Sequence, residues 1–230
     1  MRVAVVTVGD ELLVGETVNT NAAWLGEQLR DRGVTVERMT TVPDRTADIA
    51  RVVNEYHADY DAVIVTGGLG PTHDDVTIEG VAAAFGREIV EDDDVVAWLE
   101  THGGYSRADL AEGTAELPAG ARFLPNHEGV APGCVVENCY VLPGVPPEMH
   151  RMFAEVAESF SGERRHVVTV EAAEPESALV DRLRSVRELF PVKVGSYPGE
   201  YVTLRFEGTD EGAVEDAAAW LRERVDRPGE

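Results

Sequence analysis

Residues 62–77 read AVIVTGGLGPTHDDVT, an apolar run followed by three glycines and two adjacent aspartates. The run Ala62–Val65 predicts a buried strand, and the glycines predict backbone that turns tightly or approaches a ligand closely. Apolar residues from Ile78 to Phe85 then recur at the spacing of a helix. We therefore predict a strand, a glycine loop and a helix, a unit that offers free N–H groups and a helix dipole to an anion.

The two carboxylates of this loop add a second requirement. Asp74 and Asp75 would repel a bare phosphate, so their presence favours a divalent cation between carboxylate and phosphate oxygens. The alternative is a helix N-cap, for which aspartate and threonine are ordinary residues, although a cap needs no group of three glycines. His73 is either an acid or ligand of this site or a spacer that faces solvent.

Two further acidic positions follow predicted strands. Val3–Val8 is rich in β-branched residues and leads to Asp10 and Glu11, and the alternating run Val34–Thr41 leads to Asp44. Carboxyl ends of parallel strands meet at the edge of the sheet where ligands bind, so we expect these side chains near the glycine loop. Asp44 is also placed to be the N-cap of the next helix.

Strands and helices alternate along the first part of the chain with short connections. This order predicts an α/β fold, a three-layer, mostly parallel sheet with helices on both faces. A first helix is expected with Val18, Ala22, Leu25 and Leu29 on one face. Residues 91–117 are less regular and are expected to be a surface excursion or a partner contact, with a helix through Val95, Val96 and Leu99 that the aspartates at 92–94 cap. Stiff loops rich in glycine and proline occur at residues 126–133 and 142–149, and the second opens a helix whose apolar face runs from Met149 to Phe160.

The pattern changes near Ser161, and we predict domains at residues 1–162 and 163–230. The second is expected to be a small α+β domain of order β-α-β-β-α, with Val180 among the apolar residues of its first helix. It carries no glycine loop, so we assign it no chemistry.

Composition limits the partners. The chain has 43 acidic and 20 basic residues and a formal net charge of -23, with Lys193 its single lysine. Such a surface disfavours nucleic acid and anionic membranes, and it suits a cytoplasm with molar salt; an acidic protein of a mesophile is the alternative. No apolar stretch is long enough for a membrane span, so we expect a cytoplasmic protein. Cys134 and Cys139 are expected to be reduced thiols, because no second pair completes a zinc site.

Three separated motifs resemble one family. GGLGPTHDDVT at 67–77, GDELLVGETVNTNAAWL at 9–25 and LPGVPPEM at 142–149 are similar to the amino-terminal domain of the CinA (competence/damage-inducible protein A) family, whose fold is shared with molybdopterin-binding domains of MogA, MoaB and MoeA. The resemblance implies metal-dependent hydrolysis of an ADP-ribose-like dinucleotide. It implies catalytic and metal-binding roles for Asp44, Asp74 and Asp75. The expected ligand-binding residues are Asp10, Glu11, Asn21, Thr66, Gly67, Gly68, Gly70, Thr72, Asn126 and Gly144.

Other functions remain open at this point. The domain is alternatively a molybdopterin-binding or adenylating module, with molybdopterin as its ligand, or a ligand-binding domain without turnover. The expected partner is a nucleotide or a pterin phosphate, and a homo-oligomer is expected. Val130 stands where the family usually has threonine, and Asn19 where aspartate is common. The amidase domain of longer members has no counterpart in the sequence, so its activity is not expected.

Overall fold

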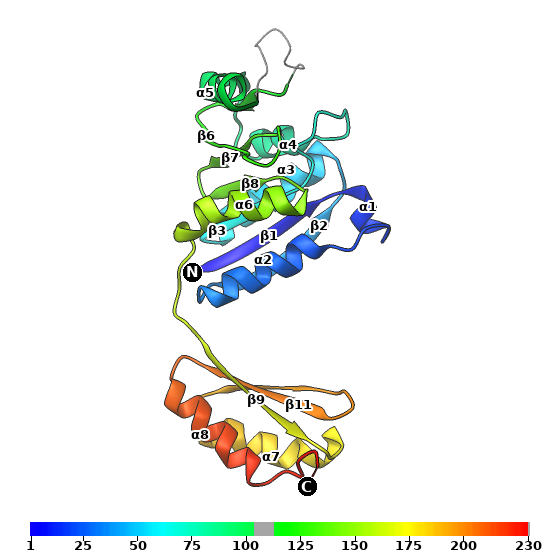
Figure 1. Ribbon diagram of the computed structural model, residues 1–230, viewed down its shortest axis with the longest axis vertical. Helices are drawn as coiled ribbons and strands as arrows, with labels where there is room; N and C mark the ends of the chain where they lie inside the picture. The colour runs from blue at the N-terminus through cyan, green and yellow to red at the C-terminus, as the bar shows by residue number, and fades with distance from the viewer. Residues whose placement is uncertain (104–112, 230) are drawn as a thin grey trace. The chain divides into compact units, whose positions relative to one another are not determined.

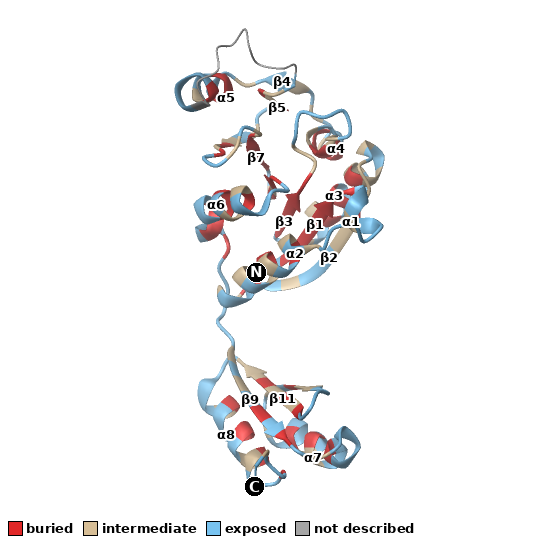
Figure 2. Ribbon diagram, turned by 45° about the vertical axis from the view of Figure 1, so that its right-hand side comes forward, coloured by how far each residue is buried: buried red, intermediate tan, exposed pale blue. Residues whose placement is uncertain are grey.

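Two strands of the computed structural model, which describes residues 1–103 and 113–229, are buried on both faces. These are β1 (Arg2–Val8) and β3 (Ala62–Thr66), drawn in red in Figure 2. Side chains of a strand alternate between faces, so Ala4 and Val6 join one apolar cluster while Val3 and Val5 join another. The continuous apolar runs of the sequence therefore form the middle layer of a three-layer domain.

The two strands belong to a six-stranded sheet of order β2-β1-β3-β8-β7-β6. β2 (Thr35–Val42), β1, β3 and β8 (Cys139–Leu142) are parallel. β7 (Gly133–Val136) and β6 (Arg122–Leu124) extend the sheet antiparallel to their neighbours. The predicted α/β fold with a mostly parallel sheet is confirmed.

Helices cover both faces of this sheet (Figure 1). α2 (Thr20–Asp31) and α6 (Pro146–Val156) contribute Leu25, Leu29, Met149 and Phe153 to the cluster on one face. Three helices contribute to the cluster on the other face, α3 (Thr46–Asp59), α4 (Thr77–Ala84) and α5 (Asp93–Trp98). A short helix, α1 (Asp10–Leu13), follows β1 directly.

One expectation about this unit was wrong in detail. Val18 is not on the helical face, because α2 begins at Thr20 and Val18 is 79% exposed. In the less regular region 91–117 the expected helix is present: Asp92 caps α5, and a π-helical turn, Leu99–Gly103, continues it. The antiparallel pairing of β4 (Ile89–Glu91) with β5 (Glu116–Pro118) was not expected. The part of the expected surface excursion at residues 104–112 lies outside the described residues.

The chain divides into two compact units, Met1–Gly162 and Glu163–Glu230. In the second unit, drawn in yellow to red in Figure 1, an antiparallel sheet of order β10-β11-β9 packs against two helices. Its elements are β9 (His166–Ala172), α7 (Glu176–Leu189), β10 (Lys193–Tyr197), β11 (Val202–Gly208) and α8 (Glu211–Arg222). Val180 lies on α7 as expected, although its side chain is 50% exposed.

A partly buried ion pair joins three segments of the second unit. Arg182 on α7 donates to both carboxylate oxygens of Glu174, one at 2.7 Å, and also to the backbone carbonyl of Arg224 after α8. The N–H of Asp226 donates to the same carboxylate at 3.1 Å. The pKa of Glu174 is lowered, first by the hydrogen bond from Arg182, so the ionised carboxylate stabilises the folded unit.

We predict that Glu174→Gln destabilises this unit by about 1 kcal/mol at neutral pH, a modest cost because the pair is partly exposed to solvent. A lowered pKa means that the stabilisation is present above the unfolded pKa, about 4.3, and is lost as the pH falls through the folded pKa. Hydrogen exchange of the β9 and β11 amides at pH 7 and pH 3 measures this. Asp181→Asn is the control, since Asp181 and Arg184 form a fully surface pair; equal effects of the two substitutions would contradict the prediction.

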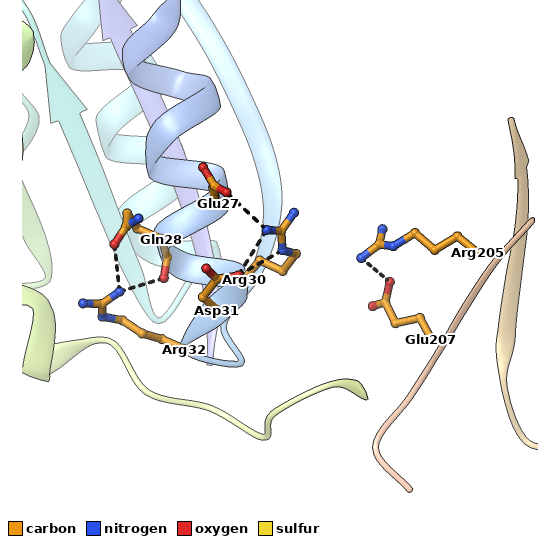
Figure 3. Close-up of polar contacts among 7 residues, drawn as sticks. All are labelled: Glu27, Gln28, Arg30, Asp31, Arg32, Arg205 and Glu207. Atoms are coloured by element: carbon orange, nitrogen blue, oxygen red, sulfur yellow. Dashed lines mark hydrogen bonds and ion pairs between the residues drawn. The ribbon is translucent and has the colours of Figure 1, made fainter. Parts of the chain in front are cut away.

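Several arginines of the acidic surface are paired with neighbouring acids. Figure 3 shows Arg30 beside Glu27 and Asp31, and Arg32 donating to Gln28 within α2. On β11, Arg205 pairs with Glu207 at 3.3 Å.

No helix in the described part of the chain is long and apolar enough to cross a membrane. Cys134 and Cys139 are free and buried, and burial raises the pKa of the Cys134 thiol to about 12.

Candidate functional site

A polar cavity of about 250 Å³ lies where β1, β2 and β3 end. The expected residues that line it are Glu11, Asn21, Asp44, Thr66, Gly67, Gly68, Asp74, Asp75 and Gly144. They come from five separate segments, which the carboxyl edge of the parallel strands brings together. Asp10 and Asn126 do not line it, and Gly70 and Thr72 line a neighbouring cavity instead.

The glycine loop, residues 66–77, has a backbone that side chains would not permit. Gly67 and Gly68 have φ of 105° and 62°, and a Cβ on Gly67 would lie 2.3 Å from the carbonyl oxygen of Val8. A Cβ on Gly70 would lie 2.5 Å from Oδ2 of Asp75. The glycines therefore let the loop pass close to β1 and close to its own carboxylate.

The loop offers free amides, although not all of the expected ones. The N–H of Gly67 donates to the carbonyl of Leu142 at 3.2 Å, so the expectation that it faces a ligand was wrong. Within the described residues, the N–H groups of Gly68, Leu69 and Gly70 donate to no acceptor. Unpaired amides at a helix entrance bind anions well, so these three N–H groups are the donors available to a phosphate.

Asp44 is in the cavity, but not as a helix cap. The N-cap of α3 is Arg45, without a side-chain hydrogen bond, because the helix begins one residue later than a capping Asp44 requires. The Asp44 carboxylate instead accepts the N–H of Asp10 at 2.7 Å. Burial raises the pKa of Asp44, and the negative charges of Asp10, Glu11 and Asp74 raise it further against the lowering effect of that hydrogen bond.

The adjacent aspartates have different surroundings. Asp75 accepts the backbone N–H of Thr72 at 3.1 Å and also its hydroxyl, so its carboxylate braces the loop. Asp74 is exposed, and so is His73, whose side chain is 99% exposed with Nδ1 3.9 Å from Asp74 Oδ1. The N-cap of α4 is Val76 without a side-chain bond, so the structure excludes the interpretation of Asp74 and Asp75 as caps.

The two asparagines expected to touch a ligand differ. Asn21 donates to the carbonyl of Gly144 at 2.7 Å, and its Oδ1 is buried with no hydrogen-bond partner among the described residues. Asn126, by contrast, donates to Ala131 and Glu148 and accepts the N–H groups of Glu128 and Gly129. The hydrogen-bonding capacity of its amide is filled by its own loop and by Glu148, so no donor or acceptor of Asn126 is left for a substrate.

Sequence analysis missed two polar groups at this edge. Asn19 is the N-cap of α2, accepting the N–H of Ala22 at 3.0 Å, and its amide donates to Thr7 at 2.8 Å, so it ties the helix to β1. The hydroxyl of Thr77 is buried without a partner among the described residues and lies close to where a Cβ on Gly68 would be. The unusual Asn at position 19 was noted from the sequence, but its contact with β1 depends on the position of Thr7.

The carboxylate oxygens of the polar cavity suit a hard cation only if atoms of a bound ligand complete its coordination. In residues 1–103 and 113–229, no group of three or more His, Cys, Asp and Glu side chains is placed to hold a metal ion by itself. Magnesium is usually held by one or two carboxylates together with water and substrate phosphates, and carboxylates are what Asp44, Asp74 and Asp75 supply. Burial is the main cause of the raised pKa of Asp44, and a cation would relieve the repulsion by Asp10, Glu11 and Asp74 that raises it further.

Comparisons with known proteins agree with this architecture. Residues 4–161 match the family described as "probable molybdopterin binding domain", and residues 164–228 match "FAD synthase, middle domain". A protein of Archaeoglobus fulgidus is 38% identical, with 97% of each chain covered. A CinA-like protein of Citrifermentans bemidjiense is 38% identical over 98% of this chain, which spans 58% of that relative's length.

A solved structure gives the same result for the first unit. CinA from Thermoplasma acidophilum, titled as a protein of unknown function, superposes with a TM-score of 0.64 at 35% identity, covering 70% of this chain and 99% of the other. The motifs at the cavity edge, the sheet topology and these matches lead to one conclusion. The chain belongs to the CinA family, and its first unit is a member of the probable molybdopterin binding domain family.

Proposed function

We propose that this protein is a divalent-metal-dependent nucleotide pyrophosphatase that hydrolyses an ADP-ribose-like dinucleotide. The observation that supports the proposal is the placement of Gly68, whose N–H is free, and of the carboxylates of Asp44, Asp74 and Asp75 around one cavity, with the free N–H groups of Leu69 and Gly70 next along the loop. Amide donors at a helix entrance suit phosphate oxygens, and carboxylates suit a hard cation that also binds phosphate.

The chain's residues have distinct roles in this proposal. The N–H groups of Gly68 and Leu69 hold non-bridging phosphate oxygens, and the unpartnered Oδ1 of Asn21 accepts a hydroxyl of the ligand. A bound divalent cation supplies charge neutralisation and a more acidic water. Water oxygen bonds to one phosphorus, the bridging oxygen leaves with the other, and the products are AMP and ribose 5-phosphate.

A second candidate is a molybdopterin-binding or adenylating module. It is favoured by the description of the family that matches residues 4–161, and the same amide donors would hold a pterin phosphate. A third is a domain that binds either ligand without turnover.

The test separates these candidates by product. The full chain is incubated with ADP-ribose and with Mg²⁺, Mn²⁺ or a chelator, and AMP and ribose 5-phosphate are quantified by chromatography. We expect both products in equal amounts, only with metal. In a parallel incubation with ATP and molybdopterin, formation of adenylated molybdopterin by a protein that does not hydrolyse ADP-ribose would instead identify the second candidate. Binding of either ligand without any product would identify the third.

A further inference from the structure

Two ring side chains stack between α2 and α6, on the face of the sheet that these helices cover. The rings of Trp24 on α2 and His150 on α6, here called the stacked pair, have centroids 3.9 Å apart and planes inclined by 19°. Both side chains are partly buried. Trp24 also meets Phe153 of α6 edge-on, with centroids 5.5 Å apart. Ring pairs in these arrangements stabilise a contact beyond the burial of their area, so the stacked pair is a specific link between the two helices.

A second link joins the same two segments one helical turn away. Asn21 precedes Trp24 by three residues on α2, and residues three apart are neighbours on the surface of a helix. The amide of Asn21 donates to the carbonyl of Gly144, two residues before α6 begins, at 2.7 Å. Asn21 and Gly144 line the polar cavity. The stacked pair therefore joins the two segments that carry this part of the cavity wall.

The position of Gly144 also matters to the glycine loop. Thr66, where the loop begins, donates its hydroxyl to the carbonyl of Pro143 at 2.6 Å. A Cβ on Gly144 would lie 3.1 Å from the Cα of Gly67, so the two backbones pack closely. A shift of α6 relative to α2 would therefore move Gly144 against both Asn21 and the glycine loop.

His150 makes this link sensitive to protonation. Burial lowers the pKa of His150, so the stacked ring is neutral at pH 7. A lowered imidazole pKa means that the stacked state is fully stable above the pKa of a free imidazole, about 6.5, and loses stability as the pH falls from there to the lowered pKa. Acid is therefore expected to weaken the contact between α2 and α6.

The charged groups of the two helices have partners of their own or face solvent. They are Glu27, Arg30, Asp31 and Arg32 on α2 and at its end, and Glu148, Arg151 and Glu155 on α6. Arg30 pairs with Glu27 and Asp31. Arg32 lies over the ring of Phe153, and Glu155 pairs with His127 at 3.1 Å. Glu148 accepts from Asn126, and Arg151 is exposed. Burial rather than any of these charges lowers the pKa of His150.

We propose that the stacked pair positions Asn21 and Gly144 for a ligand in the polar cavity, and that protonation of His150 releases them. This inference rests on the proposed function only in taking the polar cavity as the ligand site. Trp24 and His150 are positioning residues, because they act through Asn21 and not on the ligand itself.

The side-chain amide of Asn21 gives a test that needs no ligand. In the full chain labelled with ¹⁵N, its NH₂ signals are identified by their absence in Asn21→Ala. They are expected to shift between about pH 7.5 and 5 with the same midpoint as the imidazole of His150. His150→Phe keeps an aromatic ring against Trp24 but cannot be protonated, so the shift with that midpoint should disappear. Asn21 signals that do not follow the titration of His150 overturn the proposal.

Affinity for AMP with Mg²⁺ provides a second measurement. His150→Gln removes both the ring and the titration, and it is expected to weaken binding about fivefold at neutral pH, the size of effect that an aromatic pair contributes. His150→Phe should bind like the original protein at neutral pH and more tightly than it in acid. The ratio of these two affinities cancels the titration of the phosphate and of the cavity carboxylates, which both proteins share. A ratio that is independent of pH contradicts the proposal.

A double substitution separates positioning from a role in stability alone. If the stacked pair acts through Asn21, His150→Gln should cost little further affinity once Asn21→Ala is present. An equal loss in both backgrounds shows that the stacked pair supports only the fold, and it overturns the inference.

The outcomes also differ from those of the proposed function. Coupled titration of Asn21 and His150 in a protein that does not hydrolyse ADP-ribose supports the stacked pair and removes the pyrophosphatase. Hydrolysis of ADP-ribose without coupled titration supports the pyrophosphatase and removes the positioning role.

Discussion

Replacing Asp44 or Asp75 with asparagine is expected to lower metal-dependent hydrolysis of ADP-ribose by about 100-fold without lowering the melting temperature. Each substitution removes one negative charge from the polar cavity and keeps an oxygen that accepts a hydrogen bond. The amide oxygen of Asp44→Asn would still accept the N–H of Asp10, and that of Asp75→Asn the N–H of Thr72. Loss of activity therefore reports the lost charge.

Stability should even rise slightly for Asp44→Asn. The pKa of Asp44 is raised in the folded protein, chiefly by burial, so the folded state favours the neutral form. A raised carboxyl pKa means that this side chain destabilises the folded state as the pH rises through the folded pKa. At pH 7 the asparagine variant is free of that cost, and its melting temperature should equal or exceed that of the original protein in the absence of metal.

The measurement is turnover against metal concentration, together with thermal unfolding. Excess metal should partly restore activity, since a weakened site still fills at higher concentration. Asp48→Asn is the matched control, because Asp48 pairs with Arg51 on the surface of α3 and lines neither cavity. Full activity in Asp44→Asn, Asp74→Asn and Asp75→Asn alike would refute the metal site and favour a binding module.

The sequence predicted the parts of this site that depend on local pattern. The side chains of Val63 to Val65 alternate between two apolar clusters. A short apolar run before a group of glycines is typical of a buried strand. The strand ends then had to meet, because parallel strands share one carboxyl edge. The approach of Glu11, Asp44 and Asp75 to one cavity follows from that rule alone.

Other features depend on distances that no local pattern contains. Asp44 was expected to cap α3, but a shift of one residue at the helix start left its carboxylate to accept the N–H of Asp10 instead. β4 and β5 span three residues each, too few to show an alternation. The cavity that neighbours the polar one joins Leu69, Ile89 and Val130, whose separation along the chain hides their proximity.

The residue type alone also did not show which hydrogen-bond partners a side chain has. Asn126 was a candidate for ligand contact because asparagine both donates and accepts hydrogen bonds. The structure uses all of that capacity within loop 126–131 and toward Glu148. Asn21 has the same chemistry but keeps one oxygen without a partner among the described residues, and only the positions of Thr66 and Gly144 reveal the difference.

Salt is expected to have the largest effect on the stability of the whole chain. With a formal net charge of -23, the folded protein concentrates negative charge that repels itself, and many of its arginines are already committed to neighbouring acids. The range of this repulsion falls from about 10 Å at 0.1 M salt to about 3 Å at 1 M. We predict that the melting temperature rises by about 10 °C or more over that change, which for a chain of this size corresponds to a few kcal/mol.

Circular-dichroism melts in KCl measure this prediction, and charge reversal separates screening from other effects of salt. Glu55→Lys on α3 and Glu188→Lys on α7 each replace an exposed acid with a base. Together they should raise the melting temperature in dilute buffer and reduce its dependence on KCl, because less repulsion remains to be screened. Sucrose, which strengthens burial without screening charge, should not reproduce the effect of KCl. A melting temperature as high in dilute buffer as in molar KCl would show that the acidic surface does not limit folding.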